Sequence, residues 1–209
     1  MTTVVVLAKR PRAGFVKTRM VPPLTYEAAA DVAAAALQDT LATVGSAAFE
    51  HCMLAFDGDP AGWLPAGWLL HRQSSGGLDE RIVAAVQSAP DGAVLLIGMD
   101  TPQLSALALH DFDPLRFDAC LGLATDGGYW VIGFANAWDA AASVLGVPMS
   151  ESFTGAEQLR RLRALGLRVQ LLDELTDVDT VEAARRVAVE APHTGFARTL
   201  RAALPNAVA

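Results

Sequence analysis

The feature that most constrains the fold is a repeated alternation of short apolar runs with longer helical patterns. Residues 3–8 form a continuous, β-branched apolar run, which is typical of a strand covered on both faces. The alternation continues along most of the 209 residues, and strands that alternate with helices predict a mainly parallel sheet. We therefore expect an α/β fold, a three-layer α/β/α sandwich around a mainly parallel, mixed central sheet.

Hydrophobic periodicity and the positions of Gly and Pro predict the bounds of the elements. The predicted strands cover residues 3–8, 52–56, 68–71, 93–97, 119–123, 129–134 and 168–172. The predicted helices cover residues 25–44, 78–88, 104–110, 156–165 and 180–189, with a further helical turn or two from residue 196. We expect a single domain over residues 1–209, with a core at about 3–190 and a C-terminal helical tail at 191–209.

The distribution of charge points to an anion near the N-terminus. The formal net charge of −7 argues against a protein that binds nucleic acid through a broad basic surface. Residues 1–26 nevertheless contain five cations and no carboxylate, and the rest of the chain carries all 23 acids. The five cations are Lys9, Arg10, Arg12, Lys17 and Arg19. An acidic protein that gathers its positive charge in one segment is expected to bind an anion there.

Other features of the sequence favour a cytoplasmic protein without a membrane partner. The apolar runs are too short to span a bilayer, and the N-terminus lacks the basic lead-in and cleavage site of a signal peptide. Cys52 and Cys120 lie far apart and show no metal-ligand spacing, so we expect reduced thiols. The oligomeric state is left open, because no apolar pattern indicates a dimer.

The loop that follows the first predicted strand has the composition of a phosphate-binding segment. Residues 9–24 contain three prolines and one glycine, and Lys17, Thr18 and Arg19 come close together within them. Lys supplies a compact positive charge and Arg a planar fork of donors, which suit phosphate oxygens. The loop matches neither the Walker motif nor the Rossmann fingerprint. The alternative interpretation is a solvated basic loop.

Two acidic residues that follow predicted strands are candidate metal ligands. Asp100 comes directly after the apolar run 93–97, and Mg²⁺ or Mn²⁺ prefers one or two protein carboxylates together with substrate phosphates. The alternative is that Asp100 caps the short helix that follows. Asp179 is the second candidate, although its spacing from Glu182 also resembles a capping box.

Two further segments are candidates for substrate contact. Asp126-Gly127-Gly128 between two predicted strands is typical of a hairpin turn, and its glycines also allow a ligand to approach the backbone closely. Residues 148–155 form a polar segment with Glu151 and Thr154. This segment is either an acceptor-binding loop or a plain helix N-terminus that Thr154 caps.

Taken in order, these motifs resemble one family. The motifs are Ala8-Lys9 with Gly14-x-Val16-Lys17-Thr18-Arg19, Gly98-x-Asp100-x-Pro102, Asp126-Gly127-Gly128-Tyr129-x-x-Ile132-Gly133 and Asp177-Val178-Asp179-Thr180. Over residues 3–190 they resemble the bacterial DUF2064 family, which is glycosyltransferase-like with the nucleotide-diphospho-sugar transferase (GT-A) fold. The Lys17-Thr18-Arg19 loop also resembles that of 2-phospho-lactate guanylyltransferases. Asp79 departs from the resemblance, because it stands where the family stretch beginning near Gly77 usually has a glycine.

The motifs and the resemblance together imply a set of site residues. The residues expected to bind the nucleotide are Ala8, Lys9, Gly14, Lys17, Thr18, Arg19, Gly77 and Asp100. The residues expected to bind the substrate are Asp126, Gly127, Gly128, Glu151 and Thr154. Asp100 and Asp179 are expected to hold Mg²⁺ or Mn²⁺. Lys17, Asp100 and Asp126 are expected to act in catalysis, with Asp126 or Glu151 as general base toward a hydroxyl acceptor.

The leading functional hypothesis is a metal-dependent glycosyltransferase that uses a nucleotide-diphospho-sugar donor and a small-molecule acceptor. The alternative is a nucleotidylyltransferase that acts on a nucleoside triphosphate and a small phosphorylated or acidic acceptor. Five cations around one loop suit a triphosphate at least as well as a diphosphate, so the charges slightly favour the alternative, whereas the resemblance favours glycosyl transfer. A third hypothesis, from another class, is a nucleotide-binding regulatory module without turnover.

Overall fold

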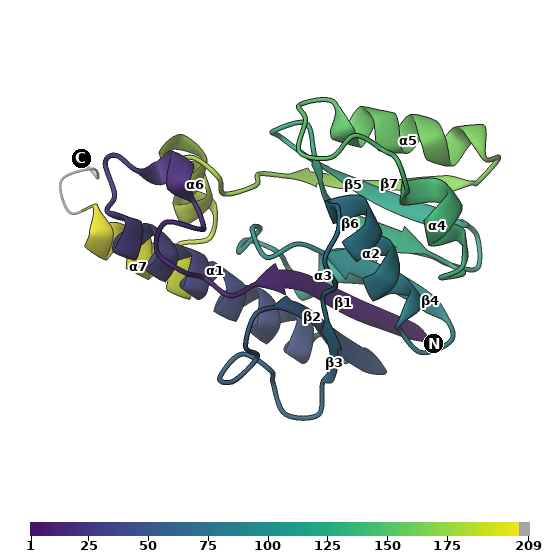
Figure 1. The fold of residues 1–209 in the computed structure, drawn as a ribbon, viewed down its shortest axis with the longest axis horizontal. Coiled ribbons are helices and arrows are strands. Elements are labelled where there is room, and N and C mark those ends of the chain that lie inside the picture. Colours follow the sequence, from purple (N-terminus) through teal and green to yellow (C-terminus); the bar gives the residue numbers. More distant parts are fainter. Residues whose placement is uncertain (205–209) are drawn as a thin grey trace.

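A seven-stranded sheet forms the middle of the molecule in the computed structural model, which describes residues 1–204 (Figure 1). The strands are β1 (Thr2–Lys9), β2 (His51–Asp57), β3 (Leu69–Arg72), β4 (Ala93–Ile97), β5 (Ala119–Ala124), β6 (Tyr129–Phe134) and β7 (Val169–Leu175). Their order across the sheet is β3-β2-β1-β4-β6-β5-β7. Strand β6 runs antiparallel to β4 and β5, and the other neighbouring pairs are parallel. The predicted mainly parallel, mixed sheet is confirmed.

The helices agree with the sequence pattern except at two places. They are η1 (Thr18–Met20), α1 (Tyr26–Ser46), α2 (Leu78–Gln87), α3 (Ala106–Leu109), α4 (Asp139–Val144), α5 (Thr154–Ala164), α6 (Val181–Glu190) and α7 (Gly195–Ala203). The short elements η1 and α4 were not predicted. Helix α7 falls in the predicted tail at 191–209, of which residues 205–209 lie outside the described part. No helix within residues 1–204 is long and apolar enough to cross a membrane.

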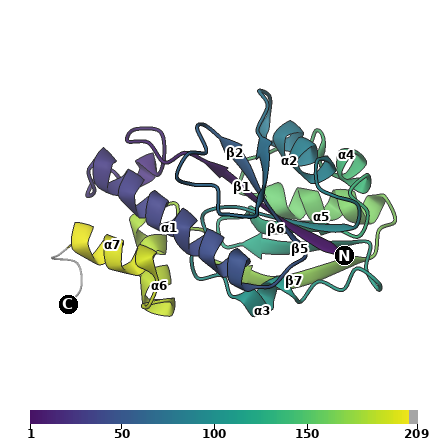
Figure 2. The same cartoon turned by 90° about the horizontal axis from the view of Figure 1, so that it is seen from below.

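Both faces of the sheet are covered, because the side chains of β1 alternate between two buried clusters. Val4 and Val6 pack in one cluster with Leu37 of α1, and α3 covers the same face. Val5 points to the opposite face and packs in the second cluster with Val86 of α2, which α4 and α5 extend. The three layers are seen from two directions in Figure 1 and Figure 2. The predicted three-layer α/β/α sandwich is confirmed.

The two C-terminal helices pack on α1 at one end of the molecule rather than on the sheet (Figure 1, Figure 2). Phe196 of α7 is fully buried in a third cluster. Met20 and Leu24, from the end of the loop that follows β1, are buried in the same cluster, and so is Val178. This cluster therefore joins the basic loop, the long helix and the C-terminal helices.

We predict that Asp39→Ala lowers the free energy of unfolding by about 1–2 kcal/mol, because Asp39 of the neighbouring helix α1 accepts two N–H groups in the first turn of α7, in addition to the cap by Thr194. Its Oδ1 accepts the Gly195 N–H at 3.0 Å and its Oδ2 accepts the Phe196 N–H at 2.7 Å. Denaturant unfolding measures the change, with Asp31→Ala on an exposed part of the same helix as the control. Equal stabilities of the two variants would contradict the capping role.

Candidate active site

A single open cavity of about 720 Å³ lies along the carboxyl edge of the sheet, and we call it the carboxyl-edge cavity. Its volume is in the range of small-molecule and cofactor sites. It brings together side chains that lie far apart in the sequence, from Leu7 to Asp179. The predicted site residues that line it are Ala8, Lys9, Lys17, Thr18, Arg19, Asp100, Asp126, Gly128, Glu151, Thr154 and Asp179.

Three of the predicted site glycines lie outside the lining of this cavity. Gly14 has a φ of 78° and provides the left-handed turn of the basic loop. Gly77 is the N-cap residue of α2, and its N–H donates to Glu80 Oε2 at 2.8 Å. Gly127 packs against the loop before α5, where a Cβ would come within 1.8 Å of the Ser152 carbonyl oxygen. In this structure these glycines shape the loops around the cavity.

Backbone and side-chain hydrogen bonds hold the ends of β4 and β7 together. The Val178 N–H donates to the Asp100 carbonyl oxygen at 2.9 Å. The Gln103 side-chain amide donates to the Thr176 carbonyl oxygen at 2.7 Å. These bonds fix the position of Asp179 relative to Asp100. Both carboxylates therefore face the carboxyl-edge cavity from fixed segments.

The capping alternatives for the two acidic residues are wrong. Helix α3 is capped by Ser105, whose hydroxyl accepts the Ala108 N–H. Helix α6 is capped by Thr180, whose hydroxyl accepts the Ala183 N–H. Asp100 and Asp179 are therefore not needed to begin these helices, and their side chains are free to bind cations.

Lys17 lies between these carboxylates and is almost completely buried, with a side-chain exposure of 5%. Its Nζ is 2.6 Å from Asp100 Oδ1 and 3.7 Å from Asp179 Oδ1. Burial alone lowers the pKa of Lys17, but the attraction of the surrounding carboxylates outweighs it and raises the pKa above its ordinary value. The side chain of Arg19 also binds Asp179, with Nη1 to Oδ2 at 2.9 Å.

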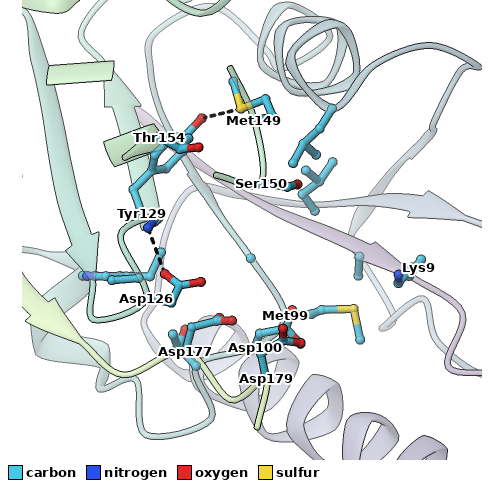
Figure 3. A pocket seen from close by; sticks show the side chains of 18 of the residues that line it. Lys9, Met99, Asp100, Asp126, Tyr129, Met149, Ser150, Thr154, Asp177 and Asp179 are labelled. Carbon is cyan, nitrogen blue, oxygen red and sulfur yellow. Dashed lines mark hydrogen bonds between the residues drawn. The ribbon is translucent and has the colours of Figure 1, made fainter. Parts of the chain in front are cut away.

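Asp177 completes this group, and we did not predict it as a site residue. It lines the carboxyl-edge cavity together with Asp179, and Figure 3 shows it close to Asp100 and Asp179. Burial and the charge of Asp100 raise the pKa of Asp177 to about 8. The signal in the sequence was the spacing of Asp177 and Asp179, because residues two apart in an extended segment point to the same side. The residue between them, Val178, is buried in the third cluster.

The carboxylates at this edge of the sheet are of the kind that binds a divalent metal. Among residues 1–204, no three His, Cys, Asp or Glu side chains are arranged around one point as a complete metal site. Mg²⁺ and Mn²⁺ do not need such a cage, because they bind through one or two carboxylates plus the phosphates of a substrate. Asp100 and Asp179 provide oxygen ligands of this kind, and a cation, the ammonium of Lys17, already lies between them. The donor set therefore fits a metal that binds together with phosphates.

The end of the carboxyl-edge cavity away from Asp100 and Asp179 carries hydroxyls and the carboxylate of Glu151, and we call it the hydroxyl end (Figure 3). Its residues are Tyr129, Ser150, Glu151, Ser152 and Thr154. Asp126 lies between this end and Asp177, and its charge helps to raise the pKa of Asp177 (Figure 3). The hairpin interpretation of residues 126–128 is confirmed, because β5 and β6 pair antiparallel and Asp126 Oδ1 accepts the Gly128 N–H at 2.8 Å. Asp126 and Gly128 of this turn also line the cavity, so the segment is both a hairpin turn and part of the candidate site.

The loop before α5 is fixed by Thr154. Its hydroxyl donates to the Pro148 carbonyl oxygen at 2.8 Å and accepts the Glu151 N–H at 3.0 Å. Helix α5 begins at Thr154 with Phe153 at the N-cap and no side-chain cap, so the interpretation of Thr154 as a helix cap is wrong. Ser150 in this loop has a φ of 62°, and strained backbone of this kind concentrates at functional sites.

Gln73 and Arg81 also line the carboxyl-edge cavity, at the side of β3 and α2, and neither was predicted. The Gln73 amide donates to the carbonyl oxygens of Ala8 and Ala55, each at 2.8 Å. Its Oε1 accepts Arg81 Nη1 at 3.1 Å. Gln73 thus fixes a half-buried guanidinium at the cavity. Its place two residues after the predicted strand 68–71, and directly after the observed β3, was the signal that could have identified it.

The fold and the composition of the cavity define a protein of the nucleotide-diphospho-sugar transferase fold class, with the GT-A fold. A candidate nucleotide-diphospho-sugar transferase from Desulfovibrio desulfuricans G20 superposes with a TM-score of 0.83 and 26% identity, over 96% of this chain and 94% of that one. Residues 28–151 match the family described as uncharacterized proteins conserved in bacteria (DUF2064). The chain belongs to the DUF2064 family.

More distant solved structures share the fold. A nucleotidyl transferase from Methanothermobacter has a TM-score of 0.61 and 15% identity, over 95% of this chain and 99% of that one. The manganese complex of Rv0371C from Mycobacterium tuberculosis H37Rv has a TM-score of 0.54 and 19% identity, over 89% and 96% of the two chains. A search of curated proteins found no match.

Proposed function

We propose that this protein is a metal-dependent glycosyltransferase, which moves a sugar from a nucleotide-diphospho-sugar to a hydroxyl group of a small acceptor. The observation that carries the proposal is the division of the carboxyl-edge cavity into two ends. One end gathers carboxylates and cations, and the hydroxyl end carries hydroxyls and the carboxylate of Glu151. This division matches a donor with charged phosphates and an acceptor with uncharged hydroxyls. The relative from Desulfovibrio supports the same class of donor.

At the charged end we assign the diphosphate to the cations of the basic loop and the metal to the carboxylates. Lys9, Thr18 and Arg19 line the same cavity, and Arg19 also binds Asp179. Asp100 and Asp179 would hold the metal, which would neutralise the charge that develops on the leaving phosphate. The manganese complex of the mycobacterial relative supports a divalent metal at this fold.

We assign the acceptor to the loop at Ser150–Thr154 at the hydroxyl end and to the turn at Asp126, which lies between the two ends. Carboxylate and hydroxyl groups of this kind hydrogen-bond to the hydroxyls of a neutral acceptor. Asp126 or Glu151 would accept the proton of the attacking hydroxyl, because both carboxylates line the cavity, Glu151 at the hydroxyl end and Asp126 between the two ends. The hydrogen bonds of the Thr154 hydroxyl to the backbone of Pro148 and Glu151 would hold the acceptor loop in position.

Nucleotidylyl transfer is the second candidate, and one observation favours it. Arg19 has a side-chain exposure of 71%, and Lys9 is also exposed, so both cations are accessible to a third phosphate. A phosphorylated or acidic acceptor fits the hydroxyl end less well. The described residues of that end include the carboxylate of Glu151 and no Lys or Arg, and the carboxylate of Asp126 lies next to it. These carboxylates would repel an anionic acceptor.

We predict that a nucleotide-diphospho-sugar stabilises the protein only in the presence of Mg²⁺ or Mn²⁺. The expected rise in the melting temperature is about 5–10 °C at a ligand concentration 100-fold above Kd. Thermal-shift measurements with nucleotide-sugars and with nucleoside triphosphates, each with and without metal, check it. A larger metal-dependent shift with a triphosphate would favour nucleotidylyl transfer. Metal-dependent binding without turnover of any acceptor would indicate a regulatory module, and no shift with either ligand would contradict both enzyme proposals.

A further inference from the structure

We propose that Lys17 occupies the place of the metal when no nucleotide is bound, and that it leaves this place when the metal enters. The inference rests on the proposed function, because it assumes a metal at Asp100 and Asp179. The ammonium lies 2.6 Å from an oxygen of Asp100 and 3.7 Å from an oxygen of Asp179. Only 5% of its side chain is exposed. No other described cation is buried between these carboxylates.

Lys17 and a metal cannot both lie between these two carboxylates. A bound Mg²⁺ lies about 2.1 Å from each carboxylate oxygen, which is closer than an ammonium hydrogen bond allows. Two cations a few ångströms apart repel each other, and the burial of the Lys17 side chain strengthens this repulsion. The metal therefore needs the space and the charge of the Lys17 ammonium, and Lys17 acts as an internal competitor of the metal.

The structure also provides a place for the displaced ammonium. Lys17 lies at the start of η1 in a left-handed backbone conformation, with φ 49° and ψ 36°. Its neighbours Thr18 and Arg19, and Lys9 across the loop, all line the carboxyl-edge cavity. Phosphates bound beside these residues would offer Lys17 a new anionic partner. The compact ammonium of Lys17 on its flexible side chain can move from the carboxylates to these phosphates.

This exchange would couple the binding of metal and nucleotide. Without phosphates, the metal must displace Lys17 from a favourable ion pair and leave it without an anion. With phosphates, Lys17 keeps an anionic partner while the metal takes its place. By thermodynamic linkage, the nucleotide then strengthens metal binding by the factor by which the metal strengthens nucleotide binding.

The first test is the affinity of the nucleotide-free protein for Mn²⁺ in the wild type and in Lys17→Met. We expect the variant to bind Mn²⁺ at least about tenfold more tightly, because its metal site no longer contains a buried positive charge. Electron paramagnetic resonance of free Mn²⁺ measures the affinity without any need for activity. An unchanged or weaker affinity in Lys17→Met would overturn the inference.

The matched control is Arg19→Met, which removes one positive charge from the same loop. Arg19 also binds Asp179, at 2.9 Å, but 71% of its side chain is exposed. We therefore expect its removal to raise the Mn²⁺ affinity by no more than about threefold, because solvent and salt screen its charge. Equal gains in the two variants would show a general effect of charge and would overturn the inference.

A second measurement follows Lys17 in the wild-type protein, and so does not depend on the folding of the variant. Lys17 should resist acylation in the protein without metal, because its side chain is buried. Saturation with Mn²⁺ should increase its acylation, as measured by mass spectrometry, relative to the exposed Lys9. Unchanged labelling of Lys17 at saturating Mn²⁺ would overturn the exchange.

The inference and the proposed function can fail separately. Metal-dependent stabilisation by a nucleotide-sugar, together with an unchanged Mn²⁺ affinity in Lys17→Met, would support the proposed function and overturn the exchange of Lys17 for the metal. Tighter Mn²⁺ binding in Lys17→Met, without stabilisation by any nucleotide, would support the exchange and contradict the proposed function.

Discussion

Asp100→Asn is expected to abolish the metal-dependent part of the thermal shift and to lower the rate of transfer by at least about a thousandfold. The carboxylate of Asp100 lies in the middle of the charged end, directly after the fully buried strand β4. An amide has almost the same shape but binds a hard cation much more weakly. The substitution therefore removes a metal ligand without leaving a void. Thermal-shift measurements with and without Mn²⁺, and an assay of nucleotide release, check the two effects.

Asp57→Asn is the matched control for this variant. Asp57 ends the neighbouring parallel strand β2 and is exposed, but it lies outside the lining of the carboxyl-edge cavity. We expect it to retain the metal-dependent shift and the transfer rate. If Asp100→Asn also retains its metal-dependent shift, the metal site has been assigned to the wrong residues.

Gly127→Ala is expected to cost about 3 kcal/mol or more in the free energy of unfolding, and to remove most of the activity. A Cβ at this position would lie 1.8 Å from the Ser152 carbonyl oxygen, and the φ of 92° is unfavourable for any other residue. The Gly127 carbonyl oxygen also accepts the Gly155 N–H at 2.8 Å, at the start of α5. Relief of the clash must therefore separate the hairpin turn from the acceptor loop. Denaturant unfolding and the kcat of the purified variant measure the two losses.

Gly166→Ala separates the cost of the backbone conformation from the cost of the clash. Gly166 has a φ of 77°, but no atom lies within 4 Å of the position where its Cβ would be. We expect a loss of only about 1 kcal/mol in stability and no loss of activity. If the two glycine variants were equally stable, the close packing at Gly127 would not matter to the fold.

Most of the sheet could be predicted because its strands are local and strongly apolar. Residues 93–97 form a continuous run rich in β-branched and leucine side chains, which favours a strand covered on both faces, and all five residues are buried in the structure. The short helix α4 was missed because its six residues, rich in alanine, are too few for a helical period to be recognised. The carboxyl end of β7 was placed three residues too early, because Asp173 and Glu174 interrupt the apolar pattern.

The position of the site could be predicted from the topology, but not the pairing of its charges. The ends of β1, β4 and β7 meet at one edge because these strands are parallel in the same sheet, and this follows from the order of the elements. The burial of Lys17 between Asp100 and Asp179 depends instead on how the basic loop folds back over that edge. Loops of this length contain no hydrophobic period, so the sequence alone offers no signal for their course.

The packing of α6 and α7 on α1 has a consequence for the opposite end of the chain. Met20 and Leu24 are buried among side chains of these C-terminal helices, only a few residues from Lys17 and Arg19. An opening of α6 and α7 away from α1 would therefore also expose the anchor of the basic loop. The basic loop and the C-terminal helices therefore form one cooperative unit of local unfolding. The protection of the η1 amides from hydrogen exchange then reports the stability of α7.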